Sequence, residues 1–136
     1  MTGPAKVKGD RAEREAALLL GDLLGAEVRR LLGAGRRDDR GDLDLPGWAI
    51  QVADWQDLAM AVRTKPLDAE VQAARADDGS LGVAMLRLWG GAFRVVMTPE
   101  TFALIAHELS RGLAARQALV RSLEIERATI YRRQQP

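Results

Sequence analysis

The chain has 136 residues, of which 47% are hydrophobic and 29% charged, with a formal net charge of +1 at pH 7. This composition is typical of one globular domain with a buried core. The lack of cysteine excludes disulfides, thiolate metal sites and a cysteine nucleophile, and the single histidine excludes a multi-histidine metal cluster. No signal peptide or membrane span is recognisable, so we expect a cytoplasmic protein without a membrane partner.

A helix is predicted from residue 9 to Gly25, because apolar side chains recur at spacings of three and four. Asp10 is the expected N-cap, and Glu13 stands three residues later, as in a capping box. Glu13 also shares the apolar stripe of this helix. A carboxylate there must be neutralised, hydrogen-bonded or bound to a cation. The local sequence leaves open whether Glu13 caps the helix or binds a cation.

A β-hairpin is predicted for residues 42–54, where two alternating runs flank a Pro-Gly pair. If that pair forms a two-residue turn, Leu45 lies opposite Trp48, and counting outward places Asp42 opposite Gln51. Cross-strand neighbours lie about 5 Å apart at Cβ. Because side chains alternate along a strand, acidic and amide oxygens gather on one face of the hairpin and apolar side chains on the other.

The other predicted elements alternate between strands and helices. They are a strand over 27–32, a short helical or irregular stretch over 55–62, a basic loop over 63–65, a helix from 67 to about 77, strands over 81–89 and 93–97, and helices over 99–110 and 113–133. Pro66 should interrupt any helix through it, because proline cannot donate the i to i−4 hydrogen bond. Thr98 and Pro99 should begin the next helix. This order predicts an α/β fold, with a mixed central β-sheet flanked by helices.

We expect residues 1–112 to form the domain and residues 113–136 to be a basic helical extension of it. The segment from Arg111 to the C-terminus carries a net charge of +4. Residues 123–133 faintly resemble the end of a helix-turn-helix unit, but Glu124 stands where the turn glycine belongs. A basic amphipathic helix that contacts a second copy or the DNA backbone is the preferred interpretation.

Three short motifs together carry a family resemblance. They are Lys8-Gly9-x-x-x-Glu13, Gly41-Asp42-Leu43 and Gln51-Val52-Ala53. This set resembles the restriction-endonuclease-like PD-(D/E)XK nucleases, and within them the archaeal and phage Holliday junction resolvases, over roughly two-thirds of the chain. The resemblance implies a restriction-endonuclease-like fold. It also implies a homodimeric, structure-selective endonuclease that cleaves branched or duplex DNA with magnesium, or alternatively manganese.

The family uses a helix glutamate, a strand aspartate and a Glu-x-Lys motif to hold the metal against the scissile phosphate. Carried over to this chain, the metal ligands are Glu13, Asp42 and Gln51, and Ala53 occupies the position of the lysine. Magnesium prefers such hard oxygen ligands at about 2.1 Å. These side chains would converge if the first helix packed across the polar face of the hairpin.

The chain departs from the family pattern at two positions. Gln51 keeps a ligating carbonyl oxygen without the charge, and Ala53 can neither donate a proton nor orient water. Loss of one general acid or base typically costs about 100- to 10,000-fold in rate. No nearby lysine obviously substitutes, because Lys65 lies beyond the following segment and Lys8 before the first helix. The chain is therefore either an engineered, cleavage-dead variant, which a lysine-to-alanine change favours, or a natural relative that binds DNA with weak or no cleavage.

Basic side chains flank the proposed site and would bind DNA phosphates. They are Lys8, Arg36, Arg37, Arg40, Arg63 and Lys65. Ordinary surface charge explains them equally well. The alternatives to a nuclease are a non-catalytic DNA-binding protein on the same fold and a small interaction protein, which would leave Glu13 and Asp42 unexplained.

Overall fold

The computed structural model describes residues 3–32 and 41–133. The chain divides into two compact units, Met1–Thr101 and Phe102–Pro136. The β-sheet and the predicted site residues belong to the first unit. The domain boundary expected after residue 112 stays a prediction.

The first unit is a mixed α/β fold, as the sequence predicted. In chain order the elements are α1 (Pro4–Leu24), β1 (Arg29–Arg30), β2 (Leu43–Leu45), β3 (Trp48–Ala53), α2 (Leu58–Ala76), β4 (Leu81–Arg87), the 3₁₀ turn η1 (Trp89–Gly91), β5 (Phe93–Val96) and α3 (Pro99–Arg133), which runs on into the second unit. The strands form one five-stranded sheet in the order β1-β2-β3-β4-β5. Only β3 and β4 pair in parallel, and α2 makes the crossover between them.

The hairpin β2–β3 has the predicted turn but not the predicted pairing at its open end. Leu45 pairs with Trp48, which confirms the two-residue turn, and the ladder ends where Leu43 pairs with Ile50. Beyond that point Gly41 bridges back to Ile50, and the Asp42 N–H donates to the Ile50 carbonyl at 2.7 Å. Asp42 therefore does not pair with Gln51. A Cβ on Gly41 would lie 2.5 Å from the Ile50 carbonyl oxygen, so this bend requires glycine.

Helix α1 begins at Pro4, earlier than predicted. Gly3 is the N-cap residue and Pro4 occupies the first turn, where its missing N–H costs no hydrogen bond. The prediction that Asp10 is the N-cap was wrong, because the preceding residues are already helical. Glu13 consequently lies in the helix interior and cannot belong to a capping box.

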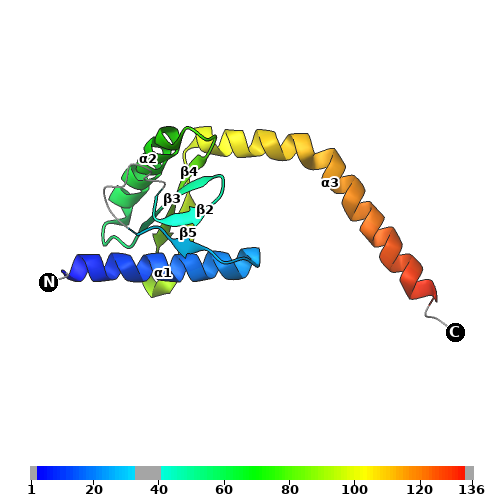
Figure 1. Cartoon of the computed structure of the whole chain (residues 1–136), viewed down its shortest axis with the longest axis horizontal. Helices are drawn as coiled ribbons and strands as arrows, with labels where there is room; N and C mark the ends of the chain where they lie inside the picture. The colour runs from blue at the N-terminus through cyan, green and yellow to red at the C-terminus, as the bar shows by residue number, and fades with distance from the viewer. Residues whose placement is uncertain (1–2, 33–40, 134–136) are drawn as a thin grey trace. The chain divides into compact units, whose positions relative to one another are not determined.

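Helices α1 and α2 cover opposite faces of the sheet (Figure 1). The face under α1 is the apolar one, with Ala12, Ala16, Ala17, Val28, Leu43, Ile50, Val52, Val83 and Met85 buried together. The face under α2 holds a smaller cluster of Ala53, Ala61, Ala84 and Leu86. The expectation that the first helix packs across the polar face of the hairpin was wrong. It packs on the apolar face because that is where its buried alanines find apolar partners.

Helix α2 runs through Pro66 without a break, contrary to the prediction. Asp57 begins the helix, and its side chain accepts a hydrogen bond from the Met60 N–H at 2.9 Å. Pro66 is buried, as are Ala61 and Ala69 on either side of it. Burial of both halves against the sheet offsets the hydrogen bond that proline cannot make. The basic loop expected over residues 63–65 is therefore helical.

Strand β4 is the central strand that its apolar run predicted, and residues 82–86 are all buried. Helix α2 crosses it at Gly82, where a Cβ would collide with the backbone of Ala69 and Glu70. The small residues on both sides let the helix backbone approach the sheet closely.

Helix α3 begins at Pro99 as predicted, and the Thr98 hydroxyl accepts a hydrogen bond from the Thr101 N–H at 3.2 Å. It continues to Arg133, so the break expected at residues 110–112 was wrong and no turn of a helix-turn-helix unit interrupts this range. A glycine such as Gly112 costs only about 1 kcal/mol inside a helix. Across residues 3–32 and 41–133, no helix combines the length and apolar character needed to cross a bilayer.

Replacement of Gly82 by alanine should destabilise the fold by about 1–3 kcal/mol, because α2 would have to move away from β4. Gly9→Ala is the control. A Cβ on Gly9, inside α1, meets nothing within 4 Å, so this variant should gain up to about 1 kcal/mol from helix propensity. Urea unfolding followed by circular dichroism measures both changes. Equal stability of the two variants would contradict the close approach of α2.

Candidate functional site

The three predicted metal ligands line one cavity of about 580 Å³. Glu13 comes from α1, Asp42 from the bend before β2, and Gln51 from β3. The other side chains around this cavity, called the site cavity below, come from α1, the segment of β1 and α2. They are Lys6, Asp10, Arg30, Leu31, Leu32 and Gln72, together with the backbone of Gly41.

Glu13 is held by Arg30. The guanidinium donates to Glu13 Oε2 from Nε at 3.0 Å and from Nη2 at 2.6 Å, and Nη2 also donates to Asp10 Oδ1 at 3.0 Å. The hydrogen bonds to Glu13 raise the pKa of Arg30, and the side chain of each of these two residues is mostly buried. The carboxylate of Glu13, which shares the apolar stripe of α1, is therefore neutralised by an arginine of β1. Sequence reasoning missed it, although Arg29 and Arg30 are the first basic residues after this helix.

The carboxylate of Asp42 is held by the backbone. Its Oδ2 accepts a hydrogen bond from the Val52 N–H at 2.7 Å. The bend at Gly41 turns this side chain toward the end of β3, so the carboxylate lies beside Gln51 in the cavity wall without pairing with it in the ladder. Charged acceptors make strong hydrogen bonds with backbone N–H groups, which fixes the carboxylate in place.

Gln51 is only 7% exposed, and its amide bonds to two side chains of α2. Its Nε2 donates to Gln72 Oε1 at 2.6 Å, and its Oε1 accepts from Lys65 Nζ at 3.3 Å. The amide oxygen therefore already has a cationic partner. A glutamine suits this buried place because it offers a donor and an acceptor without an unpaired charge.

Lys65, on α2, contacts Gln51 but does not itself line the site cavity. Its ammonium also lies 3.7 Å from Asp68 Oδ2 and 5.0 Å from the centroid of the Trp55 ring, and its side chain is 18% exposed. The prediction that no nearby lysine substitutes rested on the position of Lys65 beyond the segment that follows the hairpin. Because α2 is continuous, residues 65, 68 and 72 share the face that meets Gln51.

Ala53 does not reach the site cavity. It is 3% exposed and packs in the α2-side cluster with Ala61, Ala84 and Leu86. A lysine in its place would bring an ammonium and four methylene groups into this cluster, at the cost of overpacking and of a buried charge. An alanine fits this cluster, and Ala53 also lines the second cavity described below.

The remaining candidate DNA contacts are scattered. Lys8 pairs with Asp54 at 3.4 Å, outside the site cavity. Arg63 is exposed on α2, two residues from Lys65 and therefore on another face of the helix. Arg36, Arg37 and Arg40 lie outside the described residues. Lys6, which the prediction did not include, lines the cavity directly.

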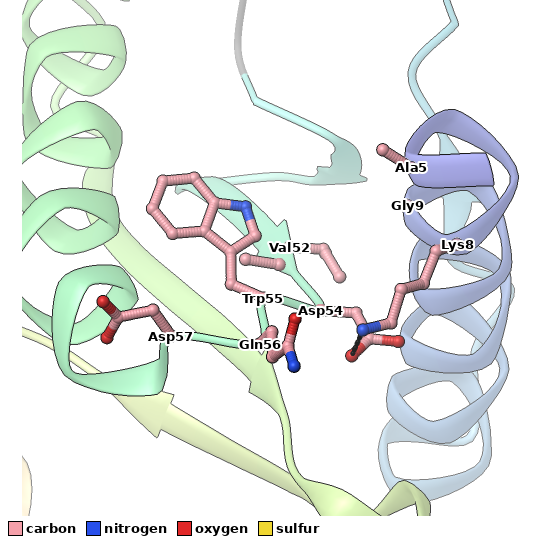
Figure 2. A pocket seen from close by; sticks show the side chains of 9 residues that line it. Ala5, Lys8, Gly9, Val52, Asp54, Trp55, Gln56 and Asp57 are labelled. Atoms are coloured by element: carbon pink, nitrogen blue, oxygen red, sulfur yellow. Dashed lines mark ion pairs between the residues drawn. The ribbon is translucent and has the colours of Figure 1, made fainter. Parts of the chain in front are cut away.

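A second cavity, of about 400 Å³, opens at the C-terminal end of β3, between the beginnings of α1 and α2 (Figure 2). Ala5, Lys8 and Gly9 form one wall, and residues 52–57 form the rest. At its border Asp54 pairs with Arg87 at 3.6 Å as well as with Lys8. Arg87 in turn donates to Glu15 of α1 at 2.6 Å, which ties α1 to the end of the sheet.

The site cavity offers the oxygen donors that magnesium prefers, since three carboxylates and two glutamine amides line it. Within the described ranges, however, no three Asp, Glu or His side chains lie close enough to hold one ion together. The donor chemistry fits magnesium, but Glu13 would first have to leave Arg30 and the Gln51 oxygen would have to leave Lys65. Glu13, Asp42 and Gln51 are the residues that would hold the ion.

Comparisons of the chain with protein-family models, with curated proteins and with solved structures gave no significant match. The geometry of the two cavities therefore carries the functional conclusions.

The ion pair between Glu15 and Arg87 should make stability depend on pH. The hydrogen bond from Arg87, with a second from Arg11, lowers the pKa of Glu15. A lowered pKa stabilises the fold above the ordinary glutamate value, and this stabilisation is lost as the pH falls through the lowered value. The wild type should exceed Glu15→Gln in melting temperature at pH 7, and the difference should shrink in acid. A difference independent of pH would contradict a charged pair.

Arg30 should compete with magnesium for Glu13. In Arg30→Met the carboxylates of Asp10 and Glu13 lose their cation, so magnesium should bind roughly tenfold more tightly, equivalent to about 1.4 kcal/mol. The shift of the melting temperature with magnesium concentration measures this affinity. The control is Arg29→Met, because Arg29 pairs with Glu27 at 3.3 Å on the exposed surface. The same magnesium response in both variants would show that Glu13 takes no part in metal binding.

Proposed function

We propose that this protein is a magnesium-dependent, structure-selective DNA endonuclease of the Holliday junction resolvase type, on a restriction-endonuclease-like fold. The observation that carries the proposal is the convergence of Glu13, Asp42 and Gln51 on one cavity. Glu13 comes from a helix distant in sequence from the hairpin that carries Asp42 and Gln51, and the three positions are those of the family motif.

Lys65 supports the catalytic form of the proposal. Its ammonium donates to the amide of Gln51 from α2, although Lys65 itself does not line the site cavity. A mostly buried ammonium can orient an attacking water or bind a phosphate oxygen. A magnesium ion, when bound, would polarise the phosphoryl oxygen and lower the pKa of that water.

Arg30 and Lys6 give the site cavity the positive charge that binding of a phosphodiester requires. Both cations line the site cavity, and the guanidinium of Arg30 has the planar geometry that binds phosphate oxygens in pairs. When Glu13 turns to the metal, Arg30 becomes available to the scissile phosphate. The same motion thus provides a ligand for the metal and a donor for the substrate.

A homodimer and a branched DNA substrate follow from the resemblance and belong to the same proposal. The Phe102–Pro136 unit leaves many large apolar side chains exposed: Phe102, Leu104, Leu109, Leu113, Leu119, Val120, Leu123 and Ile125. A surface of this kind is a candidate for contact with a second copy of the chain.

A non-catalytic DNA-binding protein is the second candidate. Two observations favour it: position 51 carries an amide without charge, and Glu13 is already neutralised by Arg30. Both features lower the affinity for a divalent ion. Binding through Lys6, Arg30 and Lys65 would remain and would weaken with salt.

Cleavage of a labelled four-way junction tests the proposal. With magnesium the wild type should nick the junction symmetrically, and EDTA should stop the reaction. Lys65→Met and Glu13→Gln should each lower the rate by about 100- to 10,000-fold while still binding the junction. Arg14→Met is the matched control, because Arg14 is exposed on α1 and lines neither cavity.

Other outcomes of this experiment separate the alternatives. Salt-sensitive binding without nicking would favour the non-catalytic candidate. No DNA binding at all would leave only an interaction protein. The variant Ala53→Lys should lose thermal stability, because position 53 is buried. Faster nicking by this variant would instead show that a lysine at position 53 reaches the site.

A further inference from the structure

We propose that the second cavity, between Trp55 and the first turns of α1, is a subsite for one nucleobase of the bound DNA strand. This inference rests on the proposed function, because it places a base next to the phosphodiester bond in the site cavity. It adds a contact that neither the motif residues nor the predicted phosphate contacts supply.

The shape of the cavity suits a flat aromatic group. Figure 2 shows the indole of Trp55 on one side and Ala5 and Gly9 of α1 on the other. A Cβ built on Gly9 would meet nothing within 4 Å, so this wall leaves open space. The volume of about 400 Å³ lies within the range of small-molecule sites.

The indole of Trp55 is contacted by a cation that lies outside the second cavity. Lys65 Nζ lies 5.0 Å from the ring centroid, a distance that gives a cation–π interaction, and Lys65 does not line this cavity. Trp55 is 37% exposed, so the ring remains accessible for stacking. Every base has a π-face, and stacking on an exposed aromatic ring is a common way to bind single-stranded or unpaired nucleotides.

Lys65 contacts one lining residue of each cavity, although it lines neither of them. The same ammonium that lies over the Trp55 ring donates to Gln51, which lines the site cavity. One side chain therefore separates the indole from the amide. A nucleotide whose phosphate enters the site cavity would have a neighbouring base within reach of Trp55.

The polar groups of the cavity favour a base over a phosphate. The carboxylates of Asp54 and Asp57 would repel a phosphate group, and Lys8, the cation among the described wall residues, is paired with Asp54. Together with the amide of Gln56 these side chains offer donors and acceptors, as the edge of a base requires. The ligand chemistry is therefore that of a nucleobase.

Tryptophan fluorescence tests this subsite. In a protein carrying Trp48→Phe and Trp89→Phe, Trp55 is the only tryptophan. Its emission should change when the four-way junction is added with calcium in place of magnesium. By gel mobility shift, Trp55→Leu should bind the junction about tenfold more weakly than the wild type, whereas Trp55→Phe, which keeps a ring, should stay within about twofold. Circular dichroism confirms that both variants are folded.

The other outcomes overturn the inference in distinguishable ways. If the junction binds but Trp55 emission is unchanged and Trp55→Leu binds normally, the subsite is wrong and the proposed function stands. If no variant binds DNA, the proposed function fails. The assignment of the second cavity to a base of a bound DNA strand then fails with it. A titration with deoxyadenosine then decides between a free nucleoside, which would quench Trp55, and no base at all.

Discussion

The close approach of α2 to the parallel strands β3 and β4 is the constraint on which the rest of the first unit depends. Ala61, Ala69 and Gly82 have little or no side chain at the crossing, and a single added Cβ at Gly82 would collide with the helix backbone. A helix held this close brings the ammonium of Lys65 to the amide of Gln51. Ala53 packs under the same helix and also lines the second cavity. A small side chain at this position is therefore part of the packing between α2 and the sheet.

The carboxylates of the site cavity are fixed by two different kinds of partner. Asp42 accepts a backbone N–H, which no ligand can displace without disturbing β3. Glu13 is bound by the side chain of Arg30, which can move without a change of fold. In the proposed site, a cation bound by Glu13 would release Arg30 from this carboxylate, so that binding of the cation would favour binding of an anion.

Local signals in the sequence predicted the fold well. The Pro-Gly turn, the apolar run of β4 and the Thr98 cap each depend on neighbouring residues, and all three are present. Pro66 was misjudged because burial of α2 on the sheet outweighs the local effect of proline. Residues 63–65 were therefore expected in a loop, and the hydrogen bond from Lys65 to Gln51 was not predicted.

The candidate site was predictable only in part. The motif spacing indicated Glu13, Asp42 and Gln51, which the fold brings to one cavity. Their partners Arg30, Gln72 and Lys65 could not be found in the same way. Each of these contacts joins elements that are distant in sequence, and they exist only through the packing of α1 and α2 on the sheet.

Because Lys65 lies on α2, its contact with Gln51 forms only when this helix packs on the sheet. A motif carried wholly by a hairpin is present as soon as two strands pair, even in a partly folded chain. Here Gln51 meets its ammonium only after the crossover helix has docked, and this helix leaves the ribosome after the hairpin. The amide hydrogen bonds of β3 and the assembled site should therefore be lost in the same cooperative unfolding step. A nascent or locally unfolded chain would hold the hairpin residues Asp42 and Gln51 without the hydrogen bond from Lys65 to Gln51.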